Sequence, residues 1–97
     1  MTPKSLLLTE KALADIQRRT VYLSQERGTE FALVWSDAIL TWLEKVAGSG
    51  AQIGTEHPSE KGVRTFGYKR QATILAEFLE TELRIIRVYF PGQDWSA

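Results

Sequence analysis

Apolar residues recur at helical spacing in the first half of the chain and at alternate positions in the second half. The helical signal is strongest at positions i, i+3, i+4, i+7, i+8, i+11 and i+15 of one segment, occupied by Phe31, Val34, Trp35, Ala38, Ile39, Trp42 and Val46. This spacing places the side chains on one face of an α-helix. We therefore predict that Trp35 and Trp42 supply the bulk of a core between a helical layer and a sheet.

Two helix starts lie close together in the sequence. Thr9 and Thr29 are candidate N-caps, and each is followed by a glutamate in the first turn. After Thr9, apolar residues follow at helical intervals until Gly28: Ala12, Leu13, Ile16 and Leu23. Because a helix that ends at Gly28 leaves almost no linker, we predict an antiparallel helix hairpin.

The apolar period changes to two after a loop at residues 48–62, which is rich in glycine and contains Pro58. Three alternating segments follow: Val63–Tyr68, Thr73–Glu80 and Arg84–Phe90. In the last of these, Ile86, Val88 and Phe90 are predicted to share one side. The simplest arrangement is a three-stranded antiparallel meander, and Leu6–Leu8 is short enough to be only an edge strand.

These elements predict a two-layer α+β fold: an N-terminal edge strand, an antiparallel helix hairpin, then a three-stranded antiparallel meander. The chain has 97 residues, 43% of them hydrophobic and 25% charged, which is the range of a globular protein. We therefore expect residues 1–97 to form one domain. Four apolar residues of the second helix lie off its main stripe and are predicted to contact the first helix or to begin a partner groove: Leu33, Leu40, Leu43 and Ala47.

Charge and composition exclude several classes of function. Twelve Lys and Arg balance twelve Asp and Glu, so no global field draws the protein to nucleic acid, and direct DNA binding is not expected. The absence of cysteine excludes disulfides, thiolate zinc sites and cysteine nucleophiles. His57 is the only histidine, so we predict neither a metal site nor a cofactor. No apolar run has the length of a signal peptide or a membrane helix, and we expect a cytoplasmic protein.

Cationic and aromatic residues of the second half are the candidate site residues. Lys69 and Arg70, with Lys61 and Arg64, form a basic cluster that fits phosphate or an acidic partner, or is only a solvated hairpin tip. Cleavage of RNA needs cations and a proton donor, and Arg64, Arg87 and Tyr89 are the candidates for those roles. The alternative is that they form the solvent side of the sheet.

The end of the chain offers one more candidate. Pro91 and Gly92 should break the last strand, so residues 93–95 are predicted to hang beyond the sheet. Trp95 then either folds back onto the core or serves as an aromatic anchor for a partner. The candidate partner-binding residues are thus Lys69, Arg70, Arg87, Tyr89 and Trp95.

The order of elements and several strings resemble the ParE/RelE superfamily of bacterial type II toxins. Leu8–Ile16 resembles the family's Leu-Thr-x-x-Ala-x-x-Asp-Leu/Ile, followed by Tyr22 and Gly28. The string at residues 62–64 resembles the Gly-Val-Arg start of the middle strand. Ile85–Trp95 resembles Ile-x-Arg-Val-x-(His, Tyr or Phe)-x-Gly-x-Asp at the end of the last strand. The resemblance covers roughly residues 5 to 95.

Three departures from the family pattern bear on activity. Many members have His at the position of Phe90 and Arg at that of Gln93, and the usual Arg is missing from Ile74–Phe78. RelE-type toxins cut ribosome-bound mRNA with a cluster of Lys, Arg and Tyr, whereas ParE-type toxins lack that set and act on DNA gyrase. The resemblance therefore implies a non-enzymatic toxin of the ParE-like branch.

By the same resemblance, the chain would belong to a plasmid-stabilization type of toxin–antitoxin system. It would bind and inhibit DNA gyrase, and a ParD-like antitoxin would neutralise it in a toxin–antitoxin hetero-oligomer. Two alternatives stay open: a RelE-like ribosome-dependent mRNA endoribonuclease, and a remnant that binds only its antitoxin.

Overall fold

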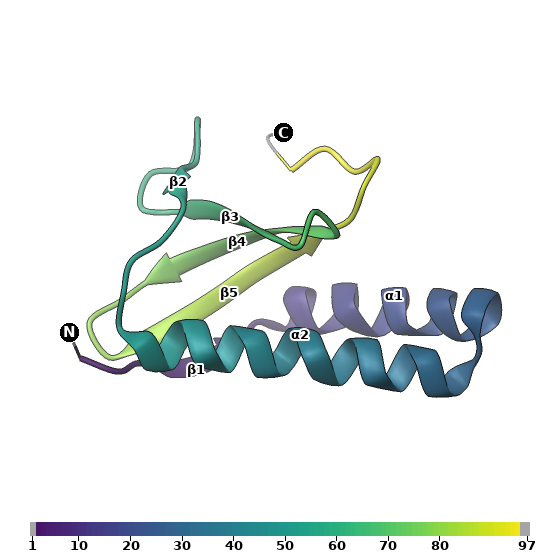
Figure 1. Cartoon of the computed structure of the whole chain (residues 1–97). Coiled ribbons are helices and arrows are strands. Elements are labelled where there is room, and N and C mark those ends of the chain that lie inside the picture. Colours follow the sequence, from purple (N-terminus) through teal and green to yellow (C-terminus); the bar gives the residue numbers. More distant parts are fainter. Residues whose placement is uncertain (1, 96–97) are drawn as a thin grey trace.

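The computed structural model describes residues 2–95 and consists of two helices packed against one face of a five-stranded sheet (Figure 1). The helices are α1 (Glu10–Arg27) and α2 (Thr29–Ser49). The strands are β1 (Ser5–Leu8), β2 (Thr55–Glu56), β3 (Arg64–Tyr68), β4 (Ala72–Phe78) and β5 (Glu82–Tyr89). The α+β class is confirmed. Neither helix in residues 2–95 combines the length and apolar character needed to cross a bilayer.

The sheet has the order β1-β5-β4-β3-β2. Strands β3, β4 and β5 form the predicted antiparallel meander, and β1 is an edge strand, as expected. Two features go beyond the prediction. β1 pairs with β5 in parallel, with Ser5 opposite Glu82, and the two residues of β2 add a short strand beside β3. The connection from β1 to β5 contains the helix hairpin and strands β2 to β4, which is the long crossover that a parallel pair requires.

One glycine separates the two helices. Thr9 caps α1 as predicted, because its Oγ1 accepts the N–H of Ala12 at 3.1 Å. Gly28, with φ of 96°, ends α1 and also stands at the N-cap of α2, without a side-chain cap. The prediction that Thr29 caps α2 is wrong: Thr29 is the first helical residue, and its hydroxyl shares a 3.2 Å hydrogen bond with that of Ser24.

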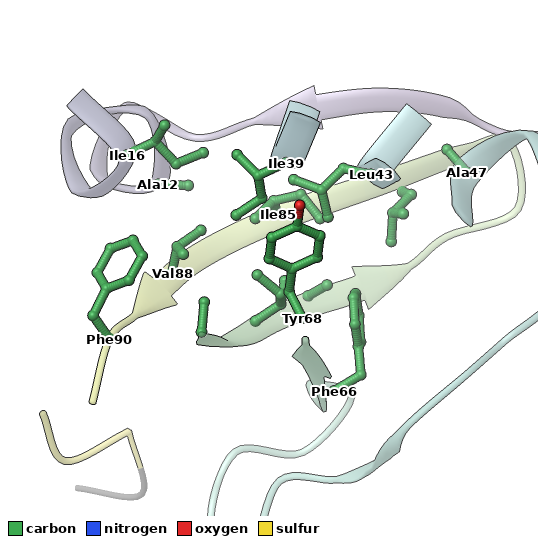
Figure 2. Packing of buried hydrophobic residues seen from close by; sticks show 14 residues of the cluster. Ala12, Ile16, Ile39, Leu43, Ala47, Phe66, Tyr68, Ile85, Val88 and Phe90 are labelled. Carbon is green, nitrogen blue, oxygen red and sulfur yellow. The ribbon is translucent and has the colours of Figure 1, made fainter. Parts of the chain in front are cut away.

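The buried face of α2 is rotated from the predicted stripe. Its buried residues are Ala32, Ile39, Leu43 and Ala47, and Figure 2 shows Ile39, Leu43 and Ala47 in the core. Trp35 and Trp42 are half-buried and pack against this core from its rim. The indole of Trp42 lies 5.0 Å from the Tyr68 ring, between centroids. The prediction that the two tryptophans form the bulk of the core is therefore wrong.

The shape of the molecule explains this rotation. The turn between α1 and α2 projects beyond the end of the sheet (Figure 1). Phe31 and Val34, at the start of the predicted stripe, lie on this projecting end and are exposed. Only the part of α2 from Ile39 onward lies over the sheet. There, small and branched side chains allow the helix to pack close to the strands.

A β-bulge also shifts the inward side of β5. Leu75 pairs with Arg87 and Ala76 with Ile85, so Ile86 is an extra residue on β5. The side chains of β5 buried in the core are consequently Leu83, Ile85 and Val88. The sequence predicted Ile86 on the inner side with Val88, because strict alternation places them on one face. The bulge moves the Ile86 side chain out of the core-facing row of β5.

Candidate functional site

Side chains from the start of the chain close the exposed half of β5. β1 accompanies β5 only as far as Ile85, so the backbone groups beyond Ile85 lack a strand partner on that edge. The side chain of Thr9 bonds to the first of these backbone groups, because its Oγ1 donates to the carbonyl of Ile86 at 2.8 Å. The side chain of Asp15 bonds to the next one, because its Oδ2 accepts the N–H of Val88 at 2.9 Å. An edge closed in this way is protected from pairing with other strands.

Asp15 is the anchor of this edge. It is only 4% exposed, and it lies on the inner face of α1 beside Ala12 and Ile16. Arg87 donates to both of its oxygens, from Nε at 2.8 Å and from Nη2 at 2.9 Å. This hydrogen bonding raises the pKa of Arg87 against the opposing effect of burial. Arg18 adds a fourth contact from the surface, because its Nη2 donates to Asp15 Oδ1 at 2.8 Å.

The three residues considered for nuclease chemistry do not come together. The Arg87 guanidinium lies 4.9 Å from the centre of the Tyr89 ring, so these two are neighbours. Arg64 lies two strands away and pairs with Ala76, which belongs to the core on the inner face of the sheet. Its Nε donates to the carbonyl of Ile53 at 3.0 Å, which ties the loop after α2 to β3.

Three of the predicted partner-binding residues line a single hollow. The hollow has a volume of about 390 Å³, and its walls include Arg70, Tyr89 and Trp95. It lies where the β3–β4 turn, the end of β5 and the C-terminal segment meet. We call it the tail hollow. Residues 90–93 form one of its sides, and the segment they belong to turns away from the helices (Figure 1).

The C-terminal segment folds back instead of hanging beyond the sheet. The N–H of Gln93 donates to the carbonyl of Phe90 at 3.0 Å, and Gln93 Oε1 accepts the N–H of Phe90 at 2.6 Å. Trp95 contacts His57, with ring centroids 5.8 Å apart in an edge-to-face arrangement. The indole is half-buried against this loop residue, it is not part of the core cluster, and part of it faces the tail hollow.

His57 holds this segment through a defined tautomer. Its Nδ1 accepts the backbone N–H groups of Ser59 and Glu60, at 3.1 and 3.0 Å. Nε2 therefore carries the proton and donates to the carbonyl of Trp95 at 3.1 Å. His57 is buried and links its own loop to the C-terminal segment. Residues 2–95 contain no group of three or more acidic or histidine side chains that would hold a metal ion.

The β3–β4 turn presents its cations in an unusual backbone conformation. Lys69 and Arg70 have φ values of 47° and 59°, and the N–H of Gln71 closes the turn on the carbonyl of Tyr68 at 2.7 Å. Positive φ at both central positions is the pattern of a type I′ turn, which strongly favours Asn-Gly. Lys and Arg are strained there, since a Cβ crowds the following carbonyl.

Relieving this strain should stabilise the protein. We expect Lys69→Asn combined with Arg70→Gly to raise the free energy of unfolding by about 1 to 2 kcal/mol. Urea unfolding followed by circular dichroism measures the change. The control is Lys69→Ala with Arg70→Ala, which removes the same charges but keeps the steric conflict. An equal gain in the alanine variant would assign the effect to charge and contradict the argument from strain.

Comparison with solved structures relates the fold to a known assembly. A chain of a structure described as "Chromosomal ParDE TA system from P. aeruginosa" superposes with a TM-score of 0.76 at 24% sequence identity. The match covers 90% of the present chain and 95% of the other. No protein-family model matches the chain, and no curated protein matches it either. At this level of identity the likeness shows a shared fold.

Proposed function

We propose that this chain is the toxin of a type II toxin–antitoxin pair of the ParE-like branch. In this proposal it acts by binding and inhibiting DNA gyrase, without catalysis, and a ParD-like antitoxin neutralises it. The observation that carries the proposal is the shared fold with a chain of a ParDE system over 90% of the sequence. The proposed role is that of a plasmid-stabilization or chromosomal toxin that acts in the cytoplasm.

The residues that resemble the family's first motif support the proposal, because each has a structural task. Thr9 caps α1 and bonds to β5. Ala12 is a fully buried residue of α1, and Asp15 closes the edge of β5. The spacing of this string therefore matches three linked structural tasks. It therefore adds weight to the likeness of fold.

The placement of the cations favours binding over RNA cleavage. A nuclease needs several cations around one phosphate and a group that moves a proton. Here Arg64 donates to the loop carbonyls of Ile53 and Gly54, and Arg87 donates to the buried carboxylate of Asp15. Tyr89 lies beside Arg87, but Arg64 is too far away to contribute a second cation to the same site.

Expression in bacteria tests the function. We expect the intact protein, expressed without an antitoxin, to stop growth, to produce filaments and to leave protein synthesis running. Labelled amino-acid incorporation and microscopy measure the two effects. Arrest of translation with cuts in ribosome-bound message that vanish in Arg87→Ala would favour the RelE-like alternative. Normal growth at good soluble expression would contradict both toxin proposals and leave the antitoxin-binding remnant.

The tail hollow is the proposed contact region for a protein partner. We expect Trp95→Ala to weaken binding of the ParD-like antitoxin or of gyrase by about 2 kcal/mol or more, because aromatic anchors dominate interface energies. The thermal midpoint should change little, since the indole is only half-buried. Calorimetric titration measures the affinity. Leu79→Ala, which truncates a partly exposed side chain between β4 and β5, is the control, and equal losses in both variants would speak against a specific anchor.

A further inference from the structure

We propose that a second hollow, between the helix hairpin and the β3–β4 turn, binds an acidic segment of a partner protein that carries an apolar side chain. The inference deepens the proposed function, because it names the chemistry of the partner segment and rests on the partner being a protein. The hollow has a volume of about 240 Å³. Its walls are Arg19, Leu23, Arg27, Phe31, Trp35, Arg70, Gln71 and Pro91, and we call it the arginine hollow.

Three guanidinium groups surround this hollow, and its walls contain no carboxylate. The salt bridges among residues 2–95 involve other arginines: Arg18, Arg84 and Arg87. Arg19, Arg27 and Arg70 thus have no carboxylate partner within the described part of the chain. A cluster of like charges lacking counter-charges repels itself, and an anionic group bound among them would remove that repulsion.

Apolar surface accompanies these charges. Phe31 is exposed, Trp35 is half-buried, and Leu23, which also lines the hollow, is buried. The indole N–H of Trp35 donates to Gln71 Oε1 at 3.2 Å, which fixes the ring against the β3–β4 turn. A rigid aromatic wall next to cations suits a segment with one apolar side chain flanked by carboxylates.

The backbone strain at Arg70 is an independent observation at the same place. Arg70 holds a left-handed φ of 59° in a turn where glycine would be relaxed. Its side chain lines both the arginine hollow and the tail hollow. Strained positions that persist tend to mark functional sites, and here the strained residue is the cation that joins the two hollows.

The arrangement of the rings favours a protein segment over nucleic acid. Bases bind through open aromatic faces, but the Arg27 guanidinium lies 4.6 Å from the centre of the Phe31 ring. Arg19 lies 4.8 Å from the Tyr22 centroid and 5.1 Å from that of Phe90. A cation thus already lies over one face of each of these rings. The zero net charge of the chain also supplies no field for a polyphosphate backbone.

The segment should dock through its side chains rather than by adding a strand. The nearby edge of β5 is closed by Thr9 and Asp15, so it offers no row of backbone groups to an extended peptide. A helical turn with carboxylates three or four residues apart presents two anions on one side, beside an apolar residue. This geometry fits three cations around an aromatic wall.

A phage-displayed library of random dodecapeptides, selected on the purified full chain, tests the inference. We expect the enriched peptides to combine two or more Asp or Glu with a Leu or an aromatic residue. The synthetic consensus peptide should bind at least about tenfold more weakly to Arg27→Ala and to Arg70→Ala, because each substitution removes one charge-assisted contact. Lys11→Ala and Lys45→Ala remove exposed cations elsewhere on the helices and should leave the affinity unchanged.

Three outcomes would overturn the inference: enriched peptides without acidic residues, affinities that are indifferent to Arg27 and Arg70, or a selection that yields no binder. A fourth would replace it with nucleic acid, namely tight binding of an oligothymidylate that the same substitutions abolish. The thermal midpoint of each variant shows whether it is folded. Because peptide binding is measured on the isolated chain, its failure is distinct from failure of the growth experiment, which tests the proposed function.

Discussion

Replacing Asp15 with alanine should lower the free energy of unfolding by about 3 to 5 kcal/mol, which is the usual cost of removing one partner of a buried ion pair. The substitution removes the acceptor of the Val88 N–H and leaves the half-buried guanidinium of Arg87 without its two bonds. A chain of this size has about 5 to 15 kcal/mol in total, so Asp15→Ala should be close to unfolding. Chemical denaturation followed by far-ultraviolet circular dichroism measures the effect.

Arg18→Ala is the matched control for this experiment. Arg18 contacts the same carboxylate at 2.8 Å but is 68% exposed, so its loss should cost about 0.5 kcal/mol or less. Asp15→Asn should fall between the two, because the amide still offers an oxygen to Val88 but no charge to Arg87. Similar stabilities of Asp15→Ala and Arg18→Ala would show that the edge of β5 does not depend on the carboxylate.

Replacing Leu43 with alanine should cost about 2 to 5 kcal/mol, because it opens a cavity in the middle of the core. Leu43 is fully buried and projects from α2 toward the sheet, close to Ile39 (Figure 2). The loss comes from the removed apolar contacts and from the space that neighbouring side chains fail to fill. Thermal unfolding monitored by calorimetry gives the change in midpoint and enthalpy.

Leu33→Ala makes the same chemical change on the same helix and is the control. Leu33 is 59% exposed on the projecting end of the hairpin, so its truncation should change the stability by about 0.5 kcal/mol or less. The pair tests which face of α2 is buried. If Leu33→Ala were the more destabilising substitution, the helix would face the sheet differently from the structure described above.

The periodicity of α2 predicted a helix correctly but not the direction of its buried face. The helix is apolar on several sides, so two stripes fit the sequence: one through Trp35 and Trp42, the other through Ile39, Leu43 and Ala47. The two stripes share Ile39, and spacing alone does not choose between them. The choice depends on where the sheet ends beneath the hairpin, which is a property of the packed molecule (Figure 1).

The candidate site was predictable only in part. Alternation on β5 placed Arg87 and Tyr89 together, and they are neighbours in the structure. The bulge at Ile86 was not visible in the sequence, because a bulge has no obligatory residue type. Asp15 did leave a signal: it is an acidic residue next to Ile16 on the apolar face of α1, where a charge needs a buried partner.

The arginine hollow left no comparable signal. Arg19 and Arg27 belong to α1 and Arg70 to the β3–β4 turn, more than 40 positions away in the sequence. Each looks like an ordinary surface cation until the hairpin packs on the sheet. The left-handed backbone of Lys69 and Arg70 was not predictable either, because neither residue type favours that conformation.

The parallel pairing of β1 with β5 determines when the protein can finish folding during its synthesis. Thr9, at the end of β1, bonds to Ile86, a residue 77 positions later. At about 5 to 20 residues per second, the ribosome needs several seconds to make the intervening chain. Until then the first strand and the apolar faces of both helices have no sheet to cover them. The nascent chain must therefore wait, incompletely folded, until β5 has been made, and any partner that recognises the native surface meets it only after that point.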